Sequence, residues 1–128
     1  MGQAYNEEAF RSLLAIERKR AAPARRSFLL LLVSVRRHPG VGNRIPPRVA
    51  DRIFSGLRVS VREVDFVGWF HQERVAGAIL TQGRQRPTPD ASRRIGQRLI
   101  HTLSGRVPPD IACRLQVRVL QLRSVHES

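Results

Sequence analysis

The sequence predicts an α+β domain built on one antiparallel sheet, and three observations lead to this class. An unbroken apolar run, Ser27 to Val35 (SFLLLLVSV), has the length of a strand and is typical of a central strand buried on both faces. Two later segments have helical spacing of apolar residues, and each is followed by strand patterning. With 128 residues, 41% of them hydrophobic, the chain can bury one core without disulfides or metal.

The first expected element is a helix over residues 6–20. Asn6 is a candidate N-cap, Glu7 and Glu8 lie in the first turn, and basic residues end the segment, as the helix dipole favours. A narrow apolar stripe runs along it, made of Phe10, Leu13, Leu14, Ala15 and Ile16. This stripe has three candidate partners, which are the core of its own domain, a second copy of the chain in a homodimer, and a segment upstream. Residues 21–24 are expected to break the helix.

The strand at 27–35 is followed by a loop and a second helix. Residues 36–47 (RRHPGVGNRIPP) hold three prolines and two glycines, which predicts a loop. Pro47 suits the first turn of a helix that runs to about Leu57. The apolar face of this helix consists of Val49, Ile53, Phe54 and Leu57.

A β-hairpin, a third helix and a last strand complete the expected elements. The hairpin has one arm from Val59 or Val61 to Phe70 and the other over 75–82. The third helix begins at Thr88 or Asp90, ends near Gly105, and turns Ile95, Leu99, Ile100 and Leu103 inward. Residues 112–122 alternate apolar and polar side chains, which predicts a half-exposed strand.

The order of elements is therefore one helix and then β-α-β-β-α-β. This is the split βαβ plan of the ferredoxin-like architecture, an antiparallel sheet with helices on one face. The expected divisions are an N-terminal helix and linker over 1–24, the main domain over 25–123 and a tail over 124–128. Because many unrelated functions share this plan, function has to be argued from particular residues.

Two motifs lie around the hairpin. Arg62-Glu-Val-Asp65 precedes its first arm, and six positions after Asp65 its tip reads His71-Gln-Glu-Arg-Val75. With this spacing, the region from Ser27 to Leu122 resembles the GGDEF domain of diguanylate cyclases, which has a nucleotide-cyclase-like fold. In that family an Arg-x-x-Asp pair precedes the hairpin and the Gly-Gly-Asp/Glu-Glu-Phe signature begins six residues after the Asp. The N-terminal helix stands where a signalling helix often leads into such domains.

The resemblance implies that the catalytic chemistry of the family is lost. Valines stand at the end of the first strand where the family has two magnesium-binding acids, and a hard cation needs oxygen ligands. In the signature, side chains replace the two glycines that let the backbone approach the triphosphate, one acid is kept, and an arginine replaces a metal ligand. The residues concerned are Val33, Val35, His71, Gln72, Glu73 and Arg74. We therefore expect a degenerate, non-enzymatic signalling module of a bacterial cytoplasm, without metal or cofactor.

A ligand site is implied by the Arg62 and Asp65 pair. In the family such a pair grips cyclic di-GMP at an inhibitory site, with the arginine in bidentate contact, and Arg94 or Arg98 of the third helix would assist it. The alternative interpretation is a structural ion pair at the start of the strand. A protein partner at the hairpin tip, next to Trp69 and Phe70, is the other candidate for a regulatory module.

The net charge of +13 raises a different possibility, a basic ferredoxin-like domain that binds nucleic acid or another phosphate-rich partner without specificity. The basic residues are arginines except for Lys19, and they are spread over every segment. RNA-recognition motifs, which share the ferredoxin-like plan, stack bases on aromatics of the central strands, and here only Phe28 is available.

Cysteine and histidine usage limits the remaining classes. Cys113 is the only cysteine, so no internal disulfide can form, which fits a reducing cytoplasm. The four histidines lack the paired spacing of a metal site, and no nucleophile-elbow pattern is present. The longest apolar run, residues 28–33, is too short to span a bilayer, so we expect no membrane association.

Overall fold

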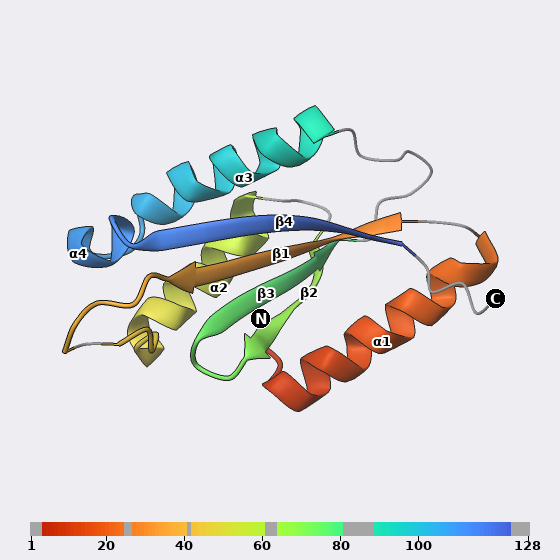
Figure 1. Ribbon diagram of the computed structural model, residues 1–128, viewed down its shortest axis with the longest axis horizontal. Helices are drawn as coiled ribbons and strands as arrows, with labels where there is room; N and C mark the ends of the chain where they lie inside the picture. The colour runs from red at the N-terminus through yellow and green to blue at the C-terminus, as the bar shows by residue number, and fades with distance from the viewer. Residues whose placement is uncertain (1–3, 25–26, 41, 61–63, 81–88, 124–128) are drawn as a thin grey trace.

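A computed structural model describes residues 4–24, 27–40, 42–60, 64–80 and 89–123 (Figure 1). The fold is α+β, with a four-stranded antiparallel open sheet in the order β2-β3-β1-β4, an arrangement compatible with the ferredoxin-like plan. The elements are α1 (Glu7–Ala24), β1 (Ser27–Val35), α2 (Pro47–Ser60), β2 (Val64–His71), β3 (Val75–Leu80), α3 (Pro89–Ser104), α4 (Pro109–Ala112) and β4 (Leu115–Arg123).

β1 is a central strand, as its apolar run predicted. It pairs antiparallel with β3 on one side and with all nine residues of β4 on the other. From Phe28 to Val35 every residue is buried except Ser34, which is half-buried. A strand with apolar side chains on both faces needs cover on both faces, and the structure provides it with two separate core clusters.

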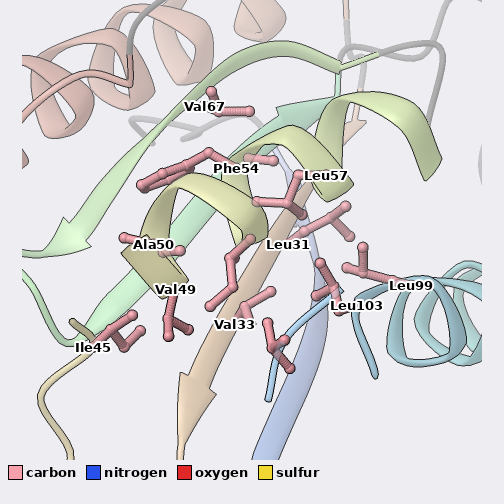
Figure 2. Packing of buried hydrophobic residues seen from close by; sticks show 14 of the residues in the cluster. Leu31, Val33, Ile45, Val49, Ala50, Phe54, Leu57, Val67, Leu99 and Leu103 are labelled. Carbon is pink, nitrogen blue, oxygen red and sulfur yellow. The ribbon is translucent and has the colours of Figure 1, made fainter. Parts of the chain in front are cut away.

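The larger cluster lies between the sheet and the helices α2 and α3 (Figure 2). Leu31 and Val33 project from β1 toward Phe54 and Leu57 of α2, and Leu99 and Leu103 of α3 close the other side. Because α2 and α3 pack closely, Gly56 has no room for a side chain, and a Cβ there would lie 2.5 Å from Leu103 Cδ2. These two helices occupy one face of the sheet, as expected.

The N-terminal helix α1 covers the opposite face, so the sheet carries helices on both faces in place of the single helical face of the ferredoxin-like plan. Its apolar stripe meets Phe28, Leu30 and Leu32 of β1, the residues that alternate with the first cluster. Phe10 is fully buried there, and Leu13 and Leu14 pack against the same cluster, whereas Ile16 is half exposed. The domain's own sheet is therefore the partner of the stripe.

Two glycines form the hollow that receives α1. Gly68 of β2 and Gly77 of β3 face each other across the hairpin, and the ring of Phe10 lies over them. A Cβ at Gly77 would lie 2.9 Å from Phe10 Cζ, and one at Gly68 would lie 2.7 Å from the Tyr5 carbonyl oxygen. Both distances are shorter than normal carbon contacts, so α1 can lie this close only because neither residue has a side chain.

Several element boundaries differ from the sequence prediction. α1 continues past Lys19 and Arg20 to Ala24, so residues 21–24 do not break the helix, although Pro23 has no N–H to donate to the carbonyl four residues earlier. α2 continues to Ser60, so Val59 lies in a helix and does not begin the hairpin arm, whereas Val61 lies outside the described residues; β2 is described from Val64. The short helix α4 was not predicted; it forms because Pro109 suits a first helical position. Thr88 and residues 81–82 lie outside the described residues.

Candidate functional site at the hairpin tip

The hairpin tip, residues 71–75, joins β2 to β3 and lies where the resemblance places the signature. The Arg74 N–H donates to the His71 carbonyl oxygen at 3.0 Å, which closes a tight turn. Glu73 has φ of +62°, and among the described residues it is the only non-glycine with a positive φ. That left-handed conformation favours glycine, so a glutamate there costs about 1–2 kcal/mol of backbone strain.

The first turn of α1 is bound directly to the tip. The Glu7 N–H donates to Gln72 Oε1 at 3.0 Å, and the Gln72 N–H donates to Glu7 Oε1 at 2.6 Å. Each residue therefore satisfies the backbone amide of the other, in the manner of a capping box made across 65 positions of sequence. Asn6 Oδ1 accepts from the Ala9 N–H at 2.9 Å, which confirms Asn6 as the N-cap.

Arg11, one turn further along α1, adds a second set of contacts. Its Nε–H donates to the Phe70 carbonyl oxygen at 3.1 Å, and its Nη2 lies 3.0 Å from His71 Nδ1. Because arginine only donates, Nδ1 is the acceptor in this pair, and the neutral His71 ring carries its proton on Nε2. The guanidinium also stacks on the Phe70 ring, 4.6 Å from its centroid.

The loop before α2 holds the other side of the tip. Arg44 Nη2 lies 2.5 Å from Glu73 Oε2, and the Ile45 N–H donates to the Glu73 carbonyl oxygen at 2.7 Å. Ile45 itself is buried in the larger core cluster, which anchors this loop. The ion pair is largely exposed, so its own contribution is about 0–1 kcal/mol. The backbone bond to Ile45 is the more reliable restraint on the turn.

The aromatic residues beside the tip have structural partners. Trp69 points toward α2, where its ring meets Phe54 edge-to-face with centroids 5.1 Å apart. Phe70 points the opposite way, beneath Arg11. They therefore lie on different faces of the sheet and do not form one aromatic platform, whereas the side chain of Arg74 is exposed.

Of the other predicted site residues, Val33 and Val35 lie beside the tip, because Ser34 between them pairs with Val75. Arg62 lies outside the described residues, and so does the side chain of Asp65. Arg94 and Arg98 are exposed on α3. Val33 and Val35, where the resemblance would place two magnesium-binding acids, are buried in the larger core cluster. Sequence reasoning missed the roles of Glu7, Arg11 and Arg44, because nothing local links residues so far apart.

Part of the arginine excess has a structural role. Arg36 donates to the Cys113 carbonyl oxygen at 2.9 Å, and Arg114 donates to those of Arg36 and Asp110 at 3.1 and 3.3 Å. Arg52 donates to the Arg106 carbonyl oxygen at 3.1 Å. These carbonyls lie in the last turn of a helix or just beyond the end of a helix or strand, where the regular hydrogen-bond pattern leaves them without a backbone partner. In contrast, Arg93, Arg94 and Arg98 project from α3 into solvent.

Within the described ranges, no group of three or more His, Cys, Asp or Glu side chains could hold a metal ion. None of the helices described is long and apolar enough to cross a bilayer. Comparison with protein-family models, with curated proteins and with solved structures finds no match to this chain.

Proposed function

We propose that this chain is a non-catalytic regulatory module of GGDEF-like type, with a ferredoxin-like, nucleotide-cyclase-like fold. The order of elements and the strand order β2-β3-β1-β4 support this fold. The spacing from Arg62-x-x-Asp65 to the hairpin tip supports the assignment to the family type.

The observation that carries the proposal is that a backbone amide of the tip is already hydrogen-bonded within the chain. A phosphate cradle needs free backbone amides that a triphosphate can approach. Here the Gln72 N–H already donates to the Glu7 carboxylate at 2.6 Å, so an anion from the chain itself lies where a phosphate would bind. The side chains of Val33 and Val35 contain no oxygen that could bind a metal, and both are packed in the core. The tip then acts as the docking point of α1.

The test is an assay for turnover. The purified protein, incubated with GTP and magnesium or manganese, is expected to yield no cyclic di-GMP by mass spectrometry. Glu73→Gln is the control, because Glu73 is the one acid of the signature that is kept. Product formed by the wild type and lost in Glu73→Gln would contradict the proposal.

The regulatory role needs a ligand or a partner. We assign cyclic di-GMP to the Arg62 and Asp65 pair, with Arg94 or Arg98 of α3 as the assisting arginine, as the family resemblance implies. The exposed Arg74 side chain at the hairpin tip is the candidate contact for a protein partner.

A second candidate is non-specific binding of nucleic acid or another phosphate-rich partner, favoured by the exposed arginines of α3. On that helix Arg93, Arg94 and Arg98 are exposed, and Asp90 is the one acid. RNA-recognition motifs stack bases on a sheet face that helices leave open. Here α1 covers the face opposite to α2 and α3, so bases cannot stack there. This function would therefore act through phosphate contacts alone and would weaken steeply with salt.

A further inference from the structure

One residue of the joint between α1 and the hairpin tip can change its charge in mild acid. His71 is the last residue of β2, and its side chain is exposed. Its Nδ1 lies 3.0 Å from Arg11 Nη2. Because a guanidinium only donates hydrogen bonds, the ring is neutral in this contact and carries its proton on Nε2. Histidine is the side chain that ordinarily changes its charge between pH 5 and 8. The contact therefore depends on a charge that mild acid can alter.

A second proton on His71 and the bond to Arg11 exclude each other. The imidazolium carries a hydrogen on both ring nitrogens, so Nδ1 loses the lone pair that accepts from Arg11. The two groups would then be positive charges 3.0 Å apart, and like charges at that distance repel each other. His71 can therefore bind this proton only after Arg11 has moved away. By linkage, proton uptake shifts the equilibrium toward the arrangement in which Arg11 is released.

The other charges around the tip do not offset this repulsion. On the segments that meet there, the described charged residues are Glu7, Glu8, Arg11, Arg44, Glu73 and Arg74. They comprise three acids and three arginines, so together they have no net charge. Glu7 already accepts from the Gln72 amide at 2.6 Å, and Glu73 is paired with Arg44. The neighbouring strand β3 carries no charge. Arg11, which touches the ring, is therefore the charge with the largest effect on its protonation.

Release of Arg11 affects the whole joint, because one guanidinium makes several of its contacts. Arg11 Nε donates to the Phe70 carbonyl oxygen at 3.1 Å and lies 3.7 Å from Glu7 Oε2, and the guanidinium lies 4.6 Å from the centroid of the Phe70 ring. Movement of the guanidinium disturbs these three contacts, and with them the position of the carboxylate that holds the Gln72 amide. Phe10 is fully buried between α1 and the sheet, so the remainder of the helix stays docked.

We propose that His71 is a pH-sensitive switch at the joint between α1 and the tip. In its neutral form His71 accepts from Arg11, and the Glu7 carboxylate occupies the Gln72 amide. In mild acid, protonated His71 releases Arg11, the first two turns of α1 loosen, and the Gln72 amide becomes accessible. The switch rests on the proposed role of the tip as the docking point of α1, and it is independent of the family type.

Hydrogen exchange of the Gln72 amide, followed by NMR on the whole chain, tests the switch. Protection is the exchange rate of an unstructured chain divided by the measured rate at the same pH. Between pH 7.5 and 5.5 the wild type is expected to lose about five- to tenfold in protection, because opening takes up one proton. His71→Asn is the matched variant, since its Oδ1 can accept from Arg11 in the place of Nδ1 and does not titrate. Its protection is expected to change by less than about twofold.

A second variant and three contrary outcomes separate the switch from the docking itself. Arg11→Met removes both the donor and the repelling charge, so it should lower the protection of the Gln72 amide at both pH values and abolish the pH dependence. Equal protection of the wild type at both pH values would overturn the switch and leave the docking intact. A pH dependence that persists in His71→Asn would do the same. A Gln72 amide without protection at pH 7.5 would overturn the switch and the docking together.

Discussion

Substituting Gly77 by alanine should weaken the packing of α1 on the sheet without changing any residue of α1. The added Cβ would lie 2.9 Å from Cζ and 3.0 Å from Cε2 of the Phe10 ring. Normal carbon contacts are about 3.5–4.0 Å, so the ring would have to move by roughly 0.5–1 Å. Phe10 is fully buried, so it cannot turn aside into solvent. Such overpacking costs about 1–3 kcal/mol, less about 0.5–1 kcal/mol gained by removing a glycine from a strand.

The magnitude can be isolated with a double-mutant cycle. Phe10→Ala alone should lower the free energy of unfolding by about 3–5 kcal/mol, because it empties the hollow. In that background Gly77→Ala should be neutral or stabilising, because the atoms it would strike are gone. The free energy of unfolding is measured by urea titration, followed by the fluorescence of Trp69, the only tryptophan.

A glycine in α3 supplies the control. Gly96→Ala places a Cβ 3.5 Å from Val119, an ordinary contact, in a helix interior, so it should stabilise the protein by up to about 1 kcal/mol. Independent sites change the free energy of unfolding additively. If the changes caused by Gly77→Ala and Phe10→Ala add to within about 0.5 kcal/mol, this explanation of how α1 docks is wrong.

Three further changes test other parts of the structure. Glu73→Gly should be more stable than Glu73→Ala by about 1 kcal/mol in urea unfolding, since both lose the Arg44 ion pair and only glycine relieves the positive φ; equal stabilities would show that the turn is unstrained. Leu13→Glu with Leu14→Glu should expose the sheet face to a hydrophobic dye, because both residues pack on the domain's own sheet; a fully folded double variant with no added dye binding would argue against this packing. Cyclic di-GMP should bind in calorimetry, weakened by about 1.5–3 kcal/mol in Arg62→Ala, the usual worth of a charged hydrogen bond; binding of any RNA or DNA with steep salt dependence, and no special effect of Arg62, would favour the basic-surface alternative.

The sheet and two of its helices could be predicted from the sequence because their signals are local. The run SFLLLLVSV predicted a strand buried on both faces, and the spacings in 47–57 and 88–105 predicted the helices that pack on it. The end of α2 was predicted too early, because Val59 and Val61 alternate like a strand while the helix continues to Ser60.

What the sequence could not predict depends on contacts between distant residues. The stripe on α1 showed that one face needs cover, but periodicity does not say what covers it. The hollow for Phe10 exists because Gly68 and Gly77 meet across the hairpin, and this depends on register. From the sequence, Glu7 was expected only to interact favourably with the helix dipole. It also hydrogen-bonds Gln72, 65 positions further along the chain, and so holds the tip in place.

We propose that the hairpin tip is a docking point for α1 in the place of a nucleotide site. The most direct test is to follow the backbone amide resonances of Gln72, Glu73 and Arg74 by NMR while GTP and magnesium are added to the whole chain. Because the Gln72 amide is already bonded to Glu7, the three resonances are expected to stay in place up to millimolar nucleotide. A saturable shift centred on Gln72 would show that nucleotide displaces the Glu7 carboxylate, and would contradict the claim.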